Sequence, residues 1–246
     1  MTSTGPAIAV RPLRFTDDLT RMRAFCETIG FRPRVESRNG GWLDLVGARG
    51  MVALHDAATS DSGGRNGETR LSFEVADADA LCRRLYDAGH VSATVWDEAY
   101  GRVLSVADPF GVRIWADERS DDDYGFRRHA GSVQSSVEPV PVRRMPDVDT
   151  YGAFLALFDL VRHDAGVDRS IAAGEGGSVA LRHGAEAEAD AAVVEPVYAT
   201  AEPLDQLLTR LHDAGHGDAT LRDDVVYVTD PDGCPTVIHS ATQAAR

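Results

Sequence analysis

The fold is decided by residues 103–115, VLSVADPFGVRIW. Apolar and β-branched residues on both sides predict two strands joined by a tight turn. Asp108 suits the first turn position because its carboxylate can accept hydrogen bonds from backbone N–H groups just ahead, Pro109 fixes φ at the second, and Gly111 takes the left-handed φ at the fourth. The same device returns at residues 225–238, VVYVTDPDGCPTVI. Two such hairpins, each closing one half of the chain, predict a duplicated domain.

Composition narrows the class of protein. The chain has 246 residues, of which 43% are hydrophobic, so one large or two ordinary domains can pack a core. A net charge of −14 argues against nucleic acid and anionic membranes as partners and is compatible with a cationic ligand, although acidic balance most often serves solubility. No apolar run reaches the roughly 18 residues of a membrane helix, and the first residues lack a secretory signal. Cys26, Cys82 and Cys234 lie far apart, which predicts reduced thiols in the cytoplasm.

The first half contains the same succession of elements twice. Residues 8–15 form a predicted strand, a helix starts at Asp17 or Asp18 and ends at Gly30, and three strands follow at 31–36, 42–46 and 51–55. After a Gly- and Ser-rich loop, the pattern repeats with a strand at 70–75, a helix that starts after Asp77 and ends at Gly89, and strands at 93–96, 102–107 and 112–116. Each succession is one βαβββ unit.

The second half repeats this pattern in weaker form. It offers a strand at 139–143, a helix starting at Asp147 or Asp149, a strand at 178–182, a helix at 205–214 and the second hairpin. Between the halves lies a polar stretch with Asp121, Asp122 and Asp123, which we interpret as a linker. We therefore predict an α+β protein with domain 1 at residues 1–117, a linker at 118–136 and a degenerate domain 2 at 137–246.

Three stretches carry a resemblance to a known family: RAFCETIGF (23–31), LSFEVAD (71–77) and DPFGVRIW (108–115). They are similar to the vicinal oxygen chelate superfamily, which includes glyoxalase, fosfomycin-resistance enzymes, extradiol dioxygenases and bleomycin-resistance proteins. The order and spacing match across residues 7–117 and more weakly across 136–241. The resemblance implies two glyoxalase-like domains, each with a cup-shaped mixed sheet built from two βαβββ units and with the ligand held in the cup.

The resemblance also locates the positions where metal-dependent members carry their ligands. The first-strand His position falls on Val10 or Arg11, the His that opens the fifth strand on Arg70, and the Glu after the turn on Trp115. In the second half the same positions fall on about Val140, Pro196 and Val237. None of these side chains can donate a lone pair to a metal ion. We therefore expect no metal and no cofactor in either cup.

Strand alternation predicts which side chains face or rim the first cup. The candidate ligand-binding residues are Trp42, Asp44, His55, Arg70, Glu74, Trp96, Arg113 and Trp115, with Tyr100 and Arg102 near the rim. Aromatic rings beside a few charged groups are typical of a small-molecule pocket, whereas the alternative is a face that packs against the second domain. His55 and Glu74 are the acid–base candidates, and a metal held by His55, Glu74 and Asp44 is the remaining alternative for an ion.

These residues lead to a functional prediction with alternatives. The first is a metal-free binding protein of the bleomycin-resistance type, which sequesters a natural product or drug in the cup of domain 1. The second is a glyoxalase- or dioxygenase-like enzyme, a lyase or isomerase, that uses a displaced divalent-metal site or His55 and Glu74 as acid and base. The third is a regulatory or scaffold protein. We expect a small-molecule partner and a monomer whose two domains pair within the chain.

Overall fold

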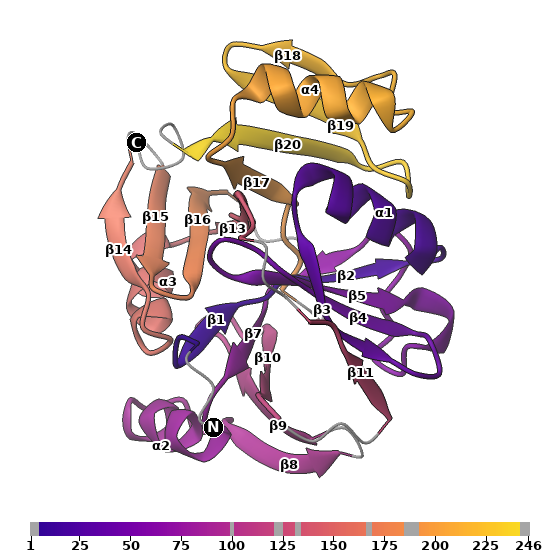
Figure 1. Cartoon of the computed structure of the whole chain (residues 1–246). Helices are drawn as coiled ribbons and strands as arrows, with labels where there is room; N and C mark the ends of the chain where they lie inside the picture. The colour runs from indigo at the N-terminus through magenta and orange to yellow at the C-terminus, as the bar shows by residue number, and fades with distance from the viewer. Residues whose placement is uncertain are drawn as a thin grey trace.

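The computed structural model describes residues 5–98, 101–120, 125–130, 134–165, 169–184 and 192–241. In these ranges the chain is an α+β protein in which four α-helices cover four sheets, and β-strands follow each helix (Figure 1). The predicted βαβββ succession is present four times. No helix in the described ranges is long and apolar enough to cross a bilayer.

The elements of the first half alternate as the sequence predicts. The first unit contains β1 (Ile8–Val10), β2 (Leu13–Thr16), α1 (Leu19–Ile29), β3 (Arg32–Ser37), β4 (Trp42–Val46) and β5 (Met51–Asp56), followed by a short 3-10 helix (Ala57–Thr59). The second contains β6 (Thr69–Arg70), β7 (Ser72–Val75), α2 (Ala78–Asp87), β8 (Thr94–Glu98), β9 (Gly101–Ala107) and β10 (Arg113–Glu118). Their sheets have the orders β1-β7-β10-β9-β8 and β11-β3-β4-β5-β2-β6, where β11 (Phe126–Arg128) is a strand that follows the second unit.

The second half has the same plan. Its first unit contains β12 (Val137–Pro139), β13 (Val142–Met145), α3 (Val148–Ala156), β14 (Val161–Asp164), β15 (Arg169–Gly174) and β16 (Gly177–His183). Its second contains β17 (Val197–Thr200), α4 (Leu204–Asp213), β18 (Thr220–Arg222), β19 (Val225–Thr229) and β20 (Pro235–Ser240). The two sheets have the orders β13-β16-β15-β14 and β12-β17-β20-β19-β18.

The two Asp-Pro hairpins have the same hydrogen bonds. Oδ1 of Asp108 accepts from the backbone N–H groups of Phe110 and Val112, both at 2.9 Å. Oδ1 of Asp230 accepts from the N–H groups two and four residues further on, at 3.0 and 2.9 Å. Gly111 and Gly233 adopt φ angles of 87° and 83°. The side-chain acceptor and the left-handed glycine predicted from the sequence are therefore present in both halves.

Two segments differ from the sequence-based prediction. The strand predicted at 8–15 is broken at residues 11–12, because β1 pairs with β7 in one sheet while β2 pairs with β5 in the other. The break lets one stretch of chain serve two sheets. In the segment expected to be a linker, β11 (Phe126–Arg128) pairs with β3 and extends a sheet of the first half. Asp121, Asp122 and Asp123 lie outside the described residues.

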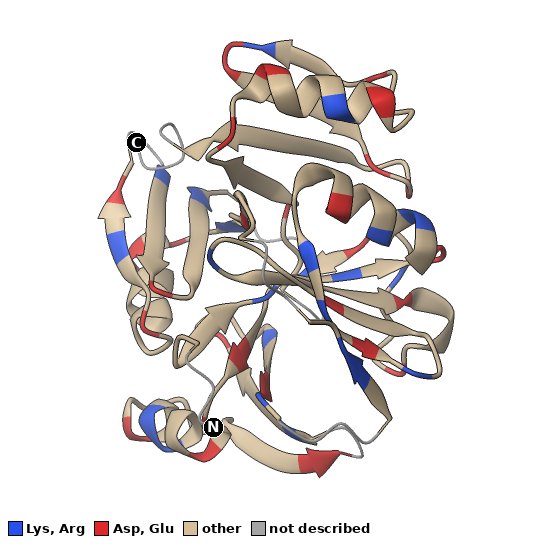
Figure 2. Cartoon of the chain, viewed as in Figure 1, with Lys and Arg blue, Asp and Glu red and all other residues tan. Residues whose placement is uncertain are grey.

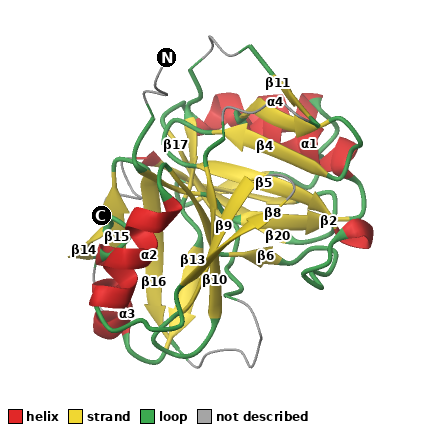
Figure 3. Ribbon diagram, turned by 90° about the horizontal axis from the view of Figure 1, so that it is seen from below, coloured by secondary structure: helices red, strands yellow, loops and turns green. Residues whose placement is uncertain are grey.

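The hydrophobic cores join the two halves crosswise. One core contains Phe25 and Leu54 from the first unit together with Leu207 and Ile238 from the last. The other joins the second unit to the third and includes the stacked rings of Phe73 and Phe158, whose centroids are 4.4 Å apart. Consequently α1 lies near α4 and α2 near α3 (Figure 3). Neither half has a core of its own that excludes the other.

Buried ion pairs also join the two halves of the chain. Arg14 on β2 pairs with Asp230 and Asp232 of the hairpin that ends the chain, the second at 3.0 Å. Arg143, in the same place on β13, lies 3.6 Å from Asp108 of the other hairpin. The hairpin that defines each half is therefore held by an arginine of the opposite half.

Candidate functional site

The first cup is the concave face shared by the two sheets of the first half. On β10, Ile114 and Ala116 enter the core, so Arg113, Trp115 and Asp117 face the other side. On β4, Leu43 and Leu45 enter the core, so Trp42 and Asp44 face the cup. The same alternation places His55 on β5 and Glu74 on β7 toward the concave side.

Six charged side chains form a network across this cup: Arg11, Arg34, Asp44, Glu74, Asp117 and Arg119. Arg34 pairs with Glu74 and lies 3.2 Å from Asp44. Arg11 pairs with Asp117 and lies 3.6 Å from Asp44. Nε of Arg119 is 2.8 Å from Oε1 of Glu74. This first-cup network links strands of both sheets and contains as many cations as anions. Figure 2 shows that both acidic (red) and basic (blue) positions lie on the strands of the first half.

Burial and ion pairing shift the pKa values of Asp44 and Glu74 in opposite directions. Burial raises the pKa of Asp44, and the nearby Arg11 and Arg34 only partly oppose it. Burial also acts to raise the pKa of Glu74, but Arg34, Arg11 and Arg119 outweigh it and the net pKa is lowered. Glu74 is thus an ionised carboxylate with three guanidinium neighbours, which makes it a weak proton acceptor.

The metal-ligand positions of the resemblance hold groups that do not fit a divalent ion. Of the two residues at the first-strand position, Val10 enters a hydrophobic core and the Arg11 guanidinium lies among carboxylates. Arg70 lies 4.8 Å from the centroid of the Phe15 ring and bonds to Glu68. Trp115 packs edge-on against Trp96. Among the described residues, no group of three or more His, Cys, Asp or Glu side chains could hold a metal ion.

The aromatic candidates gather in two clusters on either side of the network. In one, His55 lies 5.4 Å from Trp42 and 5.8 Å from Phe15. In the other, Trp96 and Trp115 are 5.6 Å apart and the Arg113 guanidinium is 5.6 Å from the Trp115 ring. All three tryptophans are partly exposed.

The eight candidate residues therefore occupy three places. Asp44 and Glu74 belong to the network. His55 and Arg70 contact Phe15, and Trp42 packs on His55, whereas the remaining three form the Trp96 cluster. Tyr100 lies outside the described residues. Sequence reasoning missed the network partners Arg34, Asp117 and Arg119. Alternation along β10 was a usable signal for Asp117, which is two residues beyond Trp115.

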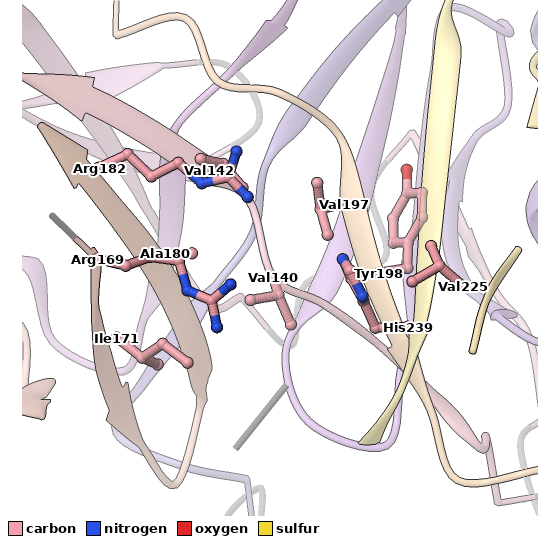
Figure 4. Close-up of a pocket in the computed structure, with 10 residues that line it drawn as sticks. All are labelled: Val140, Val142, Arg169, Ile171, Ala180, Arg182, Val197, Tyr198, Val225 and His239. Carbon is pink, nitrogen blue, oxygen red and sulfur yellow. The ribbon is translucent and has the colours of Figure 1, made fainter. Parts of the chain in front are cut away.

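The second cup, formed by the two sheets of the second half, contains a pocket of about 310 Å³ (Figure 4). Ten residues line it: Val140, Val142, Arg169, Ile171, Ala180, Arg182, Val197, Tyr198, Val225 and His239. Most are apolar, and none of the ten is acidic. Val140, at the first-strand metal position of the resemblance, is one of the apolar residues, so this lining does not fit a metal ion either.

Comparison with known proteins gives one family match and many structural neighbours. Residues 9–116 match the family model described as Glyoxalase/Bleomycin resistance protein/Dioxygenase superfamily. No curated protein sequence matches the chain significantly.

The solved structures share the whole fold at low identity. A homoprotocatechuate 2,3-dioxygenase from Arthrobacter globiformis superposes with a TM-score of 0.63 at 15% identity, covering 98% of this chain and 82% of that chain. A catechol 2,3-dioxygenase gives 0.61 at 16% identity, covering 95% and 86%. An extradiol ring-cleaving dioxygenase from B. fuscum gives 0.62 at 14% identity, covering 96% and 73%. The tandem arrangement of glyoxalase-like domains is confirmed as the fold of this chain.

Proposed function

Because residues 9–116 belong to the glyoxalase, bleomycin resistance protein and dioxygenase superfamily, we propose that this chain is a metal-free small-molecule binding protein of the bleomycin-resistance type. The observation that supports the proposal is the first-cup network. A protein cation, Arg11, lies between carboxylates at the position where metal-dependent members of the resemblance carry a ligand. The site keeps its charge balance without an ion, and the chemistry that such an ion would supply has no anchor here.

The two aromatic clusters are the proposed contact surfaces for a natural product or drug. Trp42 and the Trp96–Trp115 pair offer ring faces and edges on which a flat molecule can stack. The Arg113 guanidinium is exposed beside this pair and can meet an acidic group. Asp44 and Glu74 already have arginine partners, so neither is a free carboxylate for a cationic ligand.

An enzyme remains the second candidate, and one observation favours it. Nδ1 of His55 lies 2.8 Å from the backbone oxygen of Asp56. A carbonyl oxygen only accepts hydrogen bonds, so Nδ1 carries a hydrogen, and in the neutral imidazole the lone pair is on Nε2. His55 can therefore act as a general base, whereas Glu74 is a weak one because its pKa is lowered.

Metal analysis and ligand titration together test the proposal. Protein purified without chelators should contain no stoichiometric divalent metal. Bleomycin should change tryptophan fluorescence and raise the melting temperature of the wild-type chain. Trp42→Ala and Trp115→Ala should each weaken binding about fivefold, because stacking on either ring contributes about 1 kcal/mol. Tyr86→Ala, an exposed aromatic on α2, is the matched control and should bind as the wild type does.

The opposite results are equally informative. A stoichiometric metal that is lost in His55→Ala would replace the binding protein by the metal-dependent enzyme. Bleomycin binding that survives both tryptophan substitutions would remove the first cup as its site.

We further propose that the chain is a monomer located in the cytoplasm. The crosswise cores bury the helices of each half against the other half, which supports pairing within one chain. Cys26, Cys82 and Cys234 are free thiols, which suits a reducing compartment.

A further inference from the structure

The second cup contains a pair of arginines that differs from the ion-paired arginines of the first cup. Arg169 on β15 and Arg182 on β16 are directly opposite each other in the antiparallel ladder. Like charges in directly opposite positions destabilise a strand pair. Neither guanidinium makes an ion pair or hydrogen bond with another described residue, in contrast to the arginines of the first-cup network.

Both arginines line the 310 Å³ pocket, together with His239 from the facing sheet (Figure 4). His239 lies on β20, where Ile238 enters the core and the residues on either side face the cup. Its imidazole is surrounded by the same two arginines and by apolar side chains, and burial together with those arginines lowers its pKa. Three nitrogen-bearing side chains from two sheets thus meet in one cavity without a carboxylate in its lining.

Apart from Tyr198, the rest of the lining is apolar. It includes Val140, Val142, Ile171, Val197 and Val225. A volume of about 310 Å³ lies at the lower end of the usual range for small-molecule sites. Such a cavity suits a molecule whose apolar body fills the floor and whose anionic group reaches the arginines, because guanidinium groups bind carboxylates and phosphates through parallel hydrogen bonds.

We propose that the second cup is a binding site for an apolar molecule with a single anionic head group, held by Arg169 and Arg182 with His239 as a further hydrogen-bond donor. This site is separate from the first cup and stands independently of the function proposed above. The anion removes the repulsion between the two opposite guanidinium groups, so part of the binding free energy comes from relief of that repulsion.

A series of probes with one body and different heads tests the site on the full chain. Octanoate, octyl phosphate, octanol and octylamine are titrated by calorimetry at low salt. Octanoate or octyl phosphate should bind at least tenfold more tightly than octanol and octylamine, and the better of the two identifies carboxylate or phosphate as the head group. Raising the ionic strength should weaken anion binding, as expected of a partly exposed charge contact.

Variants assign the binding to the two arginines. Arg169→Gln and Arg182→Gln should each weaken binding of the better anion at least tenfold and leave octanol binding unchanged. Arg144→Gln is the matched control, because Arg144 belongs to the same domain but pairs with Glu195 at the surface. Circular dichroism melting checks that all three variants fold.

Several outcomes would overturn the proposal. Failure of both anions to bind, binding of octanol as tight as that of the anions, or unchanged affinity in both arginine variants would each refute it. None of these results bears on bleomycin binding by the first cup, so failure of one proposal remains distinguishable from failure of the other.

Discussion

The two cups are built on the same repeated unit and differ in how they hold charge. In the first cup, Arg11, Arg34 and Arg119 each face a carboxylate, and the resulting network connects the two sheets. In the second, Arg169 and Arg182 face each other above an apolar floor. The comparison teaches that one repeated unit can support both a charge-balanced cup and a cup with surplus positive charge in the same chain. The first cup pairs its arginines with carboxylates, and the second leaves two arginines without an ionic partner among the described residues, beside apolar side chains.

The largest expected effect comes from breaking the first-cup network. Glu74→Gln removes the carboxylate that Arg34 and Arg119 share, in a site where Glu74 is only 3% exposed. The free energy of unfolding should fall by about 3 kcal/mol, the usual cost of removing one partner from a buried ion pair. Urea denaturation at neutral pH measures it. Glu195→Gln, which breaks the exposed pair with Arg144, is the control and should cost less than about 0.5 kcal/mol.

Glu74→Gln also changes how the free energy of unfolding falls at acidic pH. Because the pKa of Glu74 is lowered in the folded state, its stabilising contribution is full above the ordinary value of 4.5 and is lost as the pH falls through the folded-state value. Glu74→Gln should therefore make this fall less steep. An unchanged slope would show that Glu74 is not held as an ionised partner.

A smaller effect, equal in the two halves, is expected at the hairpins. Gly111→Ala and Gly233→Ala place a Cβ on residues with φ angles of 87° and 83°, with no other atom within 4 Å of that Cβ. Each should cost about 1 kcal/mol from backbone strain alone. Since the halves share their cores, both variants should still unfold in one transition during denaturation. If the losses in free energy of unfolding differ by more than a factor of two, the two hairpins are not equally constrained.

In the second cup, in contrast, removing a charged side chain is expected to increase the free energy of unfolding. Arg182→Gln removes the repulsion with Arg169, so the ligand-free protein should gain about 0.5 kcal/mol in its free energy of unfolding. Matched denaturation curves of the wild type and Arg144→Gln provide the reference. A loss of stability in Arg182→Gln would mean that the guanidinium has a favourable partner.

The smallest effect is a pH dependence from His239. Burial and the neighbouring Arg169 and Arg182 lower its pKa from the ordinary value of 6.5, so the folded state binds this proton less well than the unfolded state does. Stability is therefore full above that value and decreases as the pH falls below it toward the folded-state pKa. Melting temperatures between neutral pH and pH 5.5 should fall less in His239→Gln than in the wild type. If the melting temperatures of the two proteins fall equally with pH, His239 does not have a lowered pKa in the folded state.

Much of the scaffold follows from local sequence. Asp18, Asp77 and Asp147 cap α1, α2 and α3 as predicted, because an Asp side chain accepts hydrogen bonds from the first-turn N–H groups of the helix. Alternation along β4 and β10 also orients Asp44 and Trp115 correctly, since the apolar neighbours must enter the core.

The partners within each cup are harder to predict. Arg34 lies where the β3–β4 register shifts, so counting along β3 does not identify its contacts. Arg119 lies at the start of the segment 118–136 interpreted as a linker, and its partner Glu74 is distant in sequence. Arg169 and Arg182 were predictable in principle. The glycines in residues 174–177, GEGG, indicate a hairpin turn in the sequence. Arg169 lies five residues before Gly174 and Arg182 five residues after Gly177, so the two arginines lie opposite each other.

The crosswise cores have a consequence for how the chain matures. Phe25 on α1 and Ile238 on β20 belong to the same core, although nearly the whole length of the polypeptide separates them. During translation, α1 leaves the ribosome long before β20 has been made, so only the strands of its own unit cover its apolar face while the intervening chain is synthesised. A product truncated before α4 and β20 would expose the rest of that core to chaperones and proteases.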